Sequence, residues 1–411
     1  MFVSRLRLTN LRCRHALEVE LADGLNILVG PNGAGKTTVL EAASLVLQGV
    51  PLRTTNVRDV MSRDRDHLRV EMELRDSVAS AAGSTPSPAG GAAGGASENH
   101  AVAPAILAAA AYGRDGERRL TADGAALEDA DRWKELIPVR TFAPDDLRLI
   151  KGSPRRRREY LDSLAGRHYS EYPGTLRRYD EALSQRNFLL RTSRGGLRDL
   201  EFEPWEALLA QTGLQVCGWR AAALASFVGA FQRTHEDLTH EPADTLRLVY
   251  RTNAADLDAD AYRARLANSR EADRQRTYTH LGPHRDDLRL LRDGLDMRDC
   301  ASQGEQRTVL LALVLAEWEQ ILAGPARPLL LLDDVMSELD ISRRSRLVAF
   351  TRRGGQTIIT TTDLRYFSAE ELGQAHVVDL GPGSEECSDG EDGVVDVAAG
   401  RRADAGEAPD D

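Results

Sequence analysis

A glycine-rich stretch near the start of the chain has the residue types and spacing of a phosphate-binding loop. It follows the apolar run 25–29, which predicts a buried strand, and precedes the run 39–43, which predicts a helix start. In the pattern G-x-x-x-x-G-K-[ST] the glycines let backbone N–H groups curl around phosphates, the lysine reaches the β- and γ-phosphates and the hydroxyl binds Mg²⁺. The residues expected to bind the nucleotide are Gly30, Pro31, Asn32, Gly33, Ala34, Gly35, Lys36, Thr37 and Thr38. A plain glycine-rich turn is the less favoured alternative, because both the spacing and the flanks fit.

Two acidic residues follow a strongly apolar stretch later in the chain. Leu329–Leu332 consists of four leucines, which favours a strand buried on both faces, as in the centre of a parallel sheet. Asp333 ends this run, where α/β sheets place their ligands. We therefore expect Asp333 and Thr37 to hold Mg²⁺, with Lys36, Asp333 and Asp334 as the catalytic residues. Asp334 would orient or deprotonate the attacking water. An acidic turn after a core strand is the alternative, and the phosphate loop makes it less favoured.

A third motif precedes a long apolar helix expected over Glu305–Leu322. The motif consists of Ser302, Gln303, Gly304, Glu305 and Gln306. A serine hydroxyl and a glycine N–H at a helix N-terminus suit a γ-phosphate. The same residues also fit a local cap, in which Ser302 and Glu305 satisfy each other's backbone N–H groups. Taken alone, the motif leaves both interpretations open.

The charge of the chain is unevenly distributed. The 411 residues carry a net charge of −11, of which −8 lies in 384–411, so the remainder is near neutral and can present a local basic face. Only 3 of the 53 basic residues are lysines, and one of them is Lys36. The 4 cysteines show no metal-ligand spacing and suit a reducing cytosol. We expect a cytoplasmic protein without a signal peptide, and no apolar run long enough to span a membrane.

The predicted elements divide the chain into four parts. Alternating strands surround the phosphate loop, helical periodicity begins near Pro154, and buried strands return after residue 281. The expected parts are an N-terminal ATPase part over 1–150, with an Ala/Gly/Ser-rich disordered insertion at about 77–104, a mainly helical arm over 151–280, a C-terminal ATPase part over 281–383 and a disordered acidic tail over 384–411. The fold class is therefore α/β, with an antiparallel β subdomain and an inserted α-helical arm.

Together the three motifs resemble those of the ATP-binding-cassette ATPases, and within them the SMC-like DNA-repair group. Further stretches are similar to the RecF family and narrow the resemblance to it. They are Lys151–Pro154 with Arg156, Arg157 and Tyr160–Asp162, then Gln185–Asn187, Gly282–Leu288 and Ala301–Arg307. The resemblance runs from Asn10 to about Leu380, apart from the insertion.

The resemblance implies a role for each motif. Gly30–Thr38 corresponds to the Walker A loop, Asp333 to the Walker B acid, Ser302–Gln306 to the signature that closes over ATP held by a second copy, and 337–340 to the D-loop. Two features of the wider class are missing, because Thr362 stands where many members have a switch histidine and 142–145 contain no Q-loop glutamine. Asp334 is also shorter than the usual glutamate. These departures imply a weak, DNA-stimulated ATPase that uses ATP mainly as a dimerisation switch.

The implied function is an ATP-dependent DNA-binding protein of recombinational repair and replication, acting in the response to DNA damage and the SOS response. A homodimer would clamp double-stranded DNA next to single-stranded gaps and help RecO and RecR to load recombinase. Arginines of the arm are candidates for phosphate contacts, with a solvated helix face as an equally weighted alternative. These candidates are Arg155–Arg158, Arg177, Arg178 and Arg186.

Two other classes of protein remain as alternatives at this point. The nucleotide-binding subunit of a membrane transporter would carry the same loop, but the large helical segment between the motifs speaks against it. An SMC-type structural protein would need hundreds of heptad residues between Lys36 and Ser302, and the mixed strands and helices there do not supply them.

Overall fold

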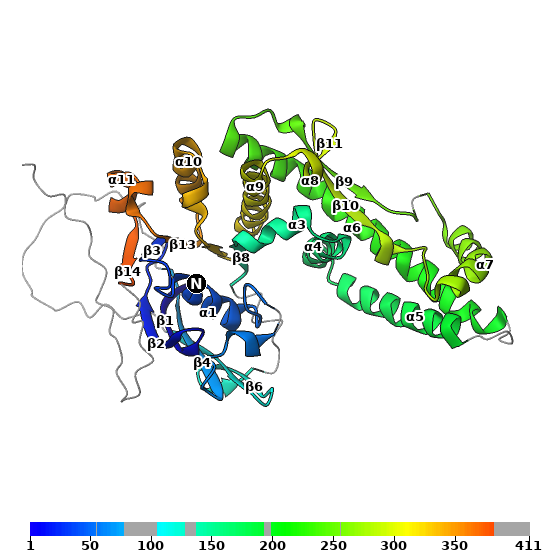
Figure 1. Cartoon of the computed structure of the whole chain (residues 1–411), viewed down its shortest axis with the longest axis horizontal. Helices are drawn as coiled ribbons and strands as arrows, with labels where there is room; N and C mark the ends of the chain where they lie inside the picture. The colour runs from blue at the N-terminus through cyan, green and yellow to red at the C-terminus, as the bar shows by residue number, and fades with distance from the viewer. Residues whose placement is uncertain (55, 78–104, 128–136, 193–198, 255, 382–411) are drawn as a thin grey trace, which may run out of the picture. The chain divides into compact units, whose positions relative to one another are not determined.

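The computed structural model describes residues 1–54, 56–77, 105–127, 137–192, 199–254 and 256–381 (Figure 1). The chain forms two compact units, which we call the head unit (Met1–Pro144 with Trp318–Asp411) and the arm unit (Asp145–Glu317). Most of the predicted insertion and the acidic tail lie outside the described residues. The two units are defined by how the chain packs, whereas the four expected parts were drawn by the motifs that they contain. The division into four parts stays a prediction.

The head unit contains a five-stranded parallel sheet (Figure 1). In spatial order its strands are β14 (His376–Asp379), β3 (Leu25–Val29), β13 (Gln356–Thr361), β12 (Leu329–Leu332) and β8 (Val139–Phe142). β12 pairs in parallel with β13 and β8, and all four of its leucines are fully buried. The leucine run therefore forms an interior strand of the parallel sheet, as its composition predicts, because apolar side chains are needed on both faces there.

A six-stranded antiparallel sheet forms the second layer of the head unit. In spatial order its strands are β2 (Arg14–Glu20), β1 (Phe2–Leu11), β4 (His67–Arg75), β5 (Ile106–Gly113), β6 (Arg118–Ala122) and β7 (Ala125–Ala126). Helix α1 (Lys36–Leu47) contacts β1, β4 and β5 of this sheet and β13 of the parallel sheet. Because 11 of its 12 residues are buried, α1 is held rigidly by both layers, and so is the loop that leads into it.

Shorter elements complete the head unit. They are the helices α10 (Ile341–Thr351) and α11 (Ala369–Gly373), and the 3₁₀ turns η1 (Val57–Val60), η2 (Pro144–Leu147), η6 (Val335–Glu338) and η7 (Leu364–Tyr366), of which η2 runs into the arm unit. Asp340 caps α10 by accepting a hydrogen bond from the Arg343 N–H at 2.9 Å. The D-loop stretch therefore sets the start of this helix.

The arm unit is mainly helical. Its helices are α3 (Arg148–Lys151), α4 (Pro154–His168), α5 (Tyr172–Thr192), α6 (Glu203–Thr239), α7 (Ala259–Arg276), α8 (Met297–Cys300) and most of α9 (Gln303–Leu322), and its 3₁₀ turns are η3 (Asp199–Glu201), η4 (Ala243–Thr245) and η5 (Pro283–Arg285). A small antiparallel sheet runs in the order β11 (Leu295–Asp296), β10 (Asp287–Arg292) and β9 (Leu246–Arg251).

Helix α6 is the long core element of the arm unit. One stretch of it is long and apolar enough to meet a length and composition test for a membrane span, which differs from the expectation that no apolar run is long enough. The helix packs against α4, α5 and α7 and buries Arg220 and His235 along with its apolar residues. These contacts are those of a core helix. The predicted α/β architecture with an antiparallel subdomain and a helical arm is confirmed.

Candidate nucleotide-binding site

The glycine-rich loop joins the end of β3 to the start of α1, at the carboxyl edge of the parallel sheet. Gly33 and Gly35 adopt left-handed backbone conformations, with φ of +84° and +85°. A Cβ atom on Gly35 would lie 2.9 Å from Nε of Arg14, so a larger residue would have to displace that side chain as well as adopt this backbone conformation. The first N–H groups of α1 are therefore presented at the inside of a tight curl, which suits a phosphate.

Lys36 lies across this loop. Its ammonium donates hydrogen bonds to the carbonyl oxygens of Gly30 at 2.6 Å and Pro31 at 2.8 Å. Burial lowers the pKa of the Lys36 ammonium, and the nearby carboxylates of Asp334 and Asp333 oppose that shift. The lysine is thus a positive charge held at the centre of the loop by carbonyl groups, which gives the loop a site for a polyanion.

Thr37 and Asp333 meet at the mouth of the loop. The Thr37 hydroxyl donates to Oδ1 of Asp333 at 2.9 Å, and the Thr360 hydroxyl, at the end of the neighbouring strand β13, donates to the same oxygen at 2.9 Å. Asp333 is 3% exposed and its N–H donates to the carbonyl of Phe142. The structure therefore brings together the two residues that the sequence paired as metal ligands. Thr360, which fixes the carboxylate, was missed, because a threonine in a buried strand carries no distinctive signal.

Arg53 also reaches this carboxylate. Its Nη2 donates to Oδ2 of Asp333 at 2.7 Å and lies 3.4 Å from the Thr37 hydroxyl. The Arg53 side chain is 42% exposed, whereas that of Asp333 is 4% exposed. Nothing in the sequence distinguishes Arg53 from the other arginines, since it belongs to no recognisable motif and follows α1 in an irregular segment.

Asp334 has an unusual backbone and an unpaired side-chain oxygen. Its φ is +48°, a conformation that costs free energy in a residue with a Cβ atom, and its N–H donates to the Thr360 hydroxyl at 2.9 Å. Oδ1 of Asp334 is buried without a hydrogen-bond partner among the described residues. Because a buried carboxylate oxygen needs a donor, this atom is suited to accept a hydrogen bond from a water molecule at the site.

The donor set at the mouth of the loop fits Mg²⁺. One hydroxyl and one carboxylate are oxygen ligands, which Mg²⁺ prefers, and it commonly takes only one or two protein carboxylates together with phosphates and water. Across the described ranges, no group of three or more His, Cys, Asp or Glu side chains forms a separate metal site. The loop, Lys36, Thr37 and Asp333 together form a site that suits a nucleoside triphosphate with its magnesium ion.

The signature stretch lies in the arm unit, at the start of α9. The Ser302 hydroxyl accepts from the Glu305 N–H at 3.3 Å, and Oε2 of Glu305 accepts from the Ser302 N–H at 2.8 Å. This is the local cap that the sequence left open as one interpretation. Gln306 donates to the carbonyl of Ala301 at 2.9 Å, and its Oε1 is buried without a partner among the described residues. Contact with a nucleotide of a second copy stays a prediction.

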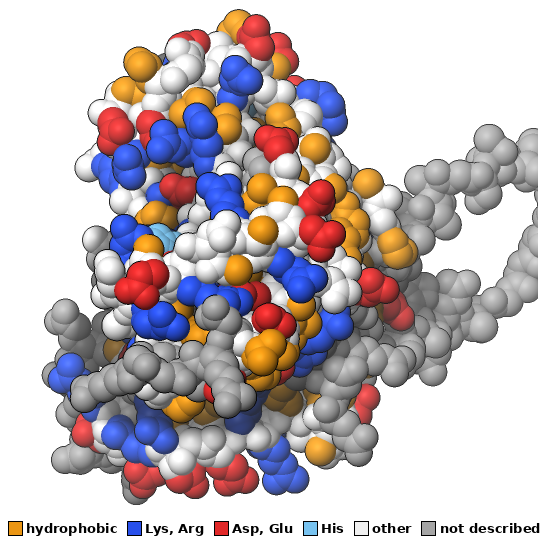
Figure 2. Space-filling view, turned by 90° about the vertical axis from the view of Figure 1, so that its right-hand side faces the viewer, with side chains coloured by type: hydrophobic (Ala, Val, Ile, Leu, Met, Phe, Trp, Pro, Cys, Tyr) orange, Lys and Arg blue, Asp and Glu red, His pale blue; other side chains and the backbone are white. Residues whose placement is uncertain are grey.

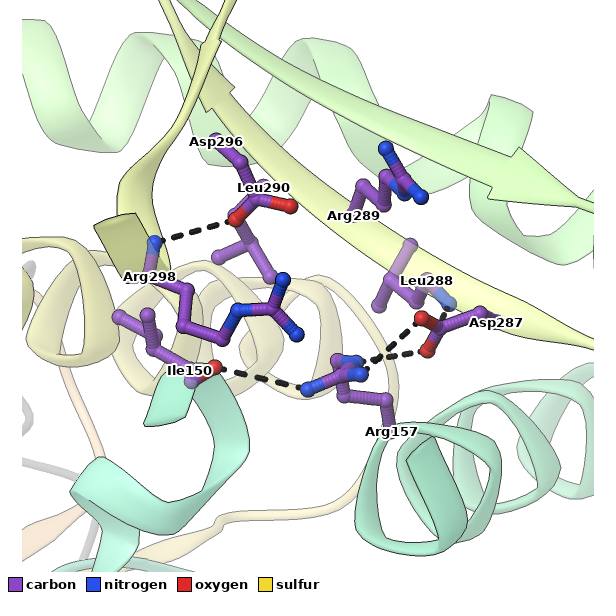
Figure 3. A pocket seen from close by; sticks show the side chains of 8 residues that line it. All are labelled: Ile150, Arg157, Asp287, Leu288, Arg289, Leu290, Asp296 and Arg298. Atoms are coloured by element: carbon purple, nitrogen blue, oxygen red, sulfur yellow. Dashed lines mark hydrogen bonds and ion pairs between the residues drawn. The ribbon is translucent and has the colours of Figure 1, made fainter. Parts of the chain in front are cut away.

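Two of the arginines proposed as DNA contacts are buried in the arm unit, so that prediction is wrong for them. Arg157 is 4% exposed and forms two hydrogen bonds to Asp287, Nε to Oδ1 at 2.6 Å and Nη2 to Oδ2 at 3.0 Å. Figure 3 shows this pair in the wall of a cavity of about 30 Å³, which is room for about two water molecules. Arg186 is fully buried. Helical periodicity does not reveal which arginines find a carboxylate from a distant segment.

Buried polar contacts give a structural role to two of the motifs that carry the family resemblance, Gln185–Asn187 and Gly282–Leu288. Arg186 donates to Glu206, to Asp273 and to Thr279, and the neighbouring Asn187 accepts from the N–H and the hydroxyl of Thr279. The motif Gln185–Asn187 therefore connects α5, α6 and the end of α7 through a buried polar network.

The second motif, Gly282–Leu288, ties η5 and the start of β10 to the helices. His284 receives a hydrogen bond from the Tyr179 hydroxyl at 2.6 Å, consistent with its ring donating to the carbonyl of Thr279 at 2.9 Å. Burial lowers the pKa of His284 to about 4. Asp286 accepts from Tyr250 and pairs with Arg220, and burial raises the pKa of its carboxyl. These residues hold the arm together.

Comparisons with known proteins identify the family of the chain. The family model described as the RecF/RecN/SMC N terminal domain matches residues 2–375. The DNA replication and repair protein RecF of Herpetosiphon aurantiacus is 35% identical over 386 residues, which cover 91% of this chain and 96% of that protein.

Two solved structures are similar to the model. The recombination mediator protein RecF-ATP in the RecFOR pathway matches with a TM-score of 0.72 and 27% identity, over 89% of this chain and 93% of that one. The Smc head domain from Pyrococcus furiosus shares the fold alone, with a TM-score of 0.50 and 14% identity over 92% and 93% of the two chains. The chain belongs to the RecF family of the RecF/RecN/SMC proteins.

Proposed function

We propose that the chain is an ATP-dependent DNA-binding protein of recombinational repair and replication. The observation that carries this proposal is the contact of Thr37 with Asp333 beside the curled loop, because it combines a triphosphate site with a metal site. The names of the relatives, DNA replication and repair protein RecF, and the solved RecF-ATP structure support this choice. No observation favours a transporter subunit.

ATP serves here mainly as a switch for dimerisation. Lys36 and the loop N–H groups bind the triphosphate, Thr37 and Asp333 hold Mg²⁺, and the metal ion supplies neutralisation of the phosphate charge. Asp334 accepts a hydrogen bond from the attacking water and holds it in place. Ser302 and Gly304 of a second copy close the site over the γ-phosphate. Asp334 is shorter than a glutamate and Thr362 has no imidazole, so hydrolysis is slow and the closed dimer persists.

DNA is bound by arginines that are exposed on the arm unit. Arg155, Arg156, Arg177 and Arg178 are exposed on α4 and α5. Figure 2 shows basic side chains spread among acidic and hydrophobic ones on the face that it draws. We therefore take the individual exposed arginines of α4 and α5 as the candidates for DNA contacts. RecO and RecR are the expected partners, a choice supported by the RecFOR pathway named for the solved relative. We expect them to act with this protein at gaps, in the cytoplasm.

Sedimentation with and without ATP tests the switch. We expect Mg²⁺-ATP to convert the wild-type protein to a dimer, Lys36→Met to stay monomeric because it does not bind the triphosphate, and Ser302→Arg to bind ATP but stay monomeric. Arg119→Gln, a change at an exposed arginine of β6 far in sequence from the motifs, serves as the control. A dimer that forms equally with and without ATP, or that tolerates Ser302→Arg, contradicts the switch.

A further inference from the structure

We infer that Arg53 is a built-in counterion of Asp333, which competes with Mg²⁺ for this carboxylate and is released when the metal is loaded. The inference rests on the proposed nucleotide site. It assigns a positioning role to a residue outside all the recognised motifs.

The ion pair occupies Oδ2 of Asp333, to which the hydroxyl groups make only one contact, from Thr37 at 3.2 Å. The hydroxyl groups of Thr360 and Thr37 each donate to Oδ1 of Asp333 at 2.9 Å. Arg53 donates to the other oxygen, Oδ2, at 2.7 Å. Lys36 is engaged with loop carbonyls, so among the described residues Arg53 is the only cation paired with Asp333. A magnesium ion ligated here would take the place of that guanidinium.

Competition follows from charge and from coordination. Mg²⁺ needs near-ideal octahedral geometry and keeps several waters, so it does not share a carboxylate face with a guanidinium that already fills it. Two cations a few ångströms apart also repel each other. Magnesium loading at Asp333 therefore requires the ion pair with Arg53 to open.

The exposures decide which partner moves. Asp333 is buried at the end of a central strand, and both its backbone N–H and its carboxylate are held by neighbouring strands. Arg53 is 42% exposed and lies in the irregular connection between α1 and η1, so its guanidinium can move into water at little desolvation cost.

The opening has a consequence for the segment around Arg53. The segment is anchored before it by α1 and after it by the bridge between Met61 and Leu11. Between these anchors, the ion pair to Asp333 ties Arg53 to the site. Its loss on magnesium loading removes one contact of Leu52–Thr54 and leaves the packing of Leu52 on the core and the hydrogen bond from Thr54 to Asp59. With one contact fewer the segment opens more often, so the state of the nucleotide site reaches the surface beside the loop.

The test measures the magnesium dependence of binding of a fluorescent ATP analogue. Arg53→Gln should lower the Mg²⁺ concentration at half-maximal binding by about fivefold, the upper end for a partly exposed ion pair. Binding of the analogue in EDTA should not become tighter. Arg53→Lys, which keeps the charge, should shift the midpoint less. Arg58→Gln makes the same change at an exposed arginine of η1 that is not a partner of Asp333, and should leave the midpoint unchanged.

A second readout follows the segment itself and does not use the magnesium midpoint. Hydrogen exchange of the peptide that covers Leu52–Thr54 should accelerate in the wild type on addition of Mg²⁺-ATP, and should already be fast in Arg53→Gln without it. A midpoint that stays the same or rises in Arg53→Gln overturns the inference. Lys36→Met should not bind the analogue at any magnesium concentration. If the wild type also fails to bind it, the result contradicts the proposed function and not the role of Arg53.

Discussion

Replacing Arg186 by methionine should destabilise the arm unit without affecting DNA contacts directly. Arg186 is fully buried and donates to Asp273 at 2.7 Å, to Glu206 at 3.2 Å, to the hydroxyl of Thr279 at 2.7 Å and to the carbonyl of Leu266 at 2.9 Å. Methionine fills much of the same volume but leaves these acceptors without their cation.

The cost follows from the charges left behind. Removing one partner of a buried ion pair costs about 3–5 kcal/mol, because the other charge stays desolvated. Glu206 keeps its ion pair with Arg270 at 2.6 Å, so part of the buried charge remains neutralised, and Asp273 keeps its hydrogen bond from His280 at 2.5 Å. We therefore expect the free energy of unfolding of the arm unit to fall by about 3 kcal/mol, the lower end of that range.

Urea unfolding followed by tryptophan fluorescence measures this loss, since Trp205 and Trp219 both lie in the arm unit. The matched control is Arg177→Met on the same helix, which is exposed and should change the free energy by less than about 0.5 kcal/mol. DNA affinity of Arg186→Met should match the wild type at temperatures where it is folded. An unchanged unfolding curve combined with weaker DNA binding would refute the reasoning.

Two further predictions concern the arm unit. Changing Arg156 and Arg177 together to glutamate should weaken DNA binding and reduce the slope of log K against log[salt] by about 2, one for each lost phosphate contact. Arg263→Glu on α7 is the control, and an equal loss there would point to a general charge effect. Because burial lowers the pKa of His284 to about 4, the unfolded chain binds its proton first as the pH falls, and stability declines below about pH 6.5. We expect about 2 kcal/mol to be lost between pH 7 and pH 5, and His284→Asn to show a flatter pH profile in thermal unfolding. A wild-type profile as flat as the variant's would contradict the burial argument.

The sequence predicted those parts of the fold and site that local pattern determines. The phosphate loop needs glycine at φ values that other residues avoid, and the four leucines of β12 need to be covered on both faces. In both cases the residue types alone indicate the local structure. From the loop and the strand together, the contact between Thr37 and Asp333 could be expected.

What the sequence did not predict depends on contacts between distant segments. Arg157 and Arg186 looked like surface charges, because helical spacing says nothing of the carboxylates that Asp287 and Asp273 bring from 130 and 87 residues away. Arg53 lies 280 residues from Asp333 and belongs to no motif. Long-range ion pairs of this kind are set by the tertiary fold and by no local pattern.

The strand order of the parallel sheet also bears on how the protein is made. β3, which leads into the phosphate loop, lies between β13 and β14, and the side chain of Asn26 bonds the backbone of Thr357, 331 residues later. At a translation rate of about 5–20 residues per second, the ribosome needs on the order of half a minute to deliver the neighbours of β3. The phosphate loop is therefore synthesised early, but the strands β13 and β14 that flank β3 are synthesised late. A chain cut short before Gln356 would contain the whole loop sequence but lack β13, the strand that pairs with β3.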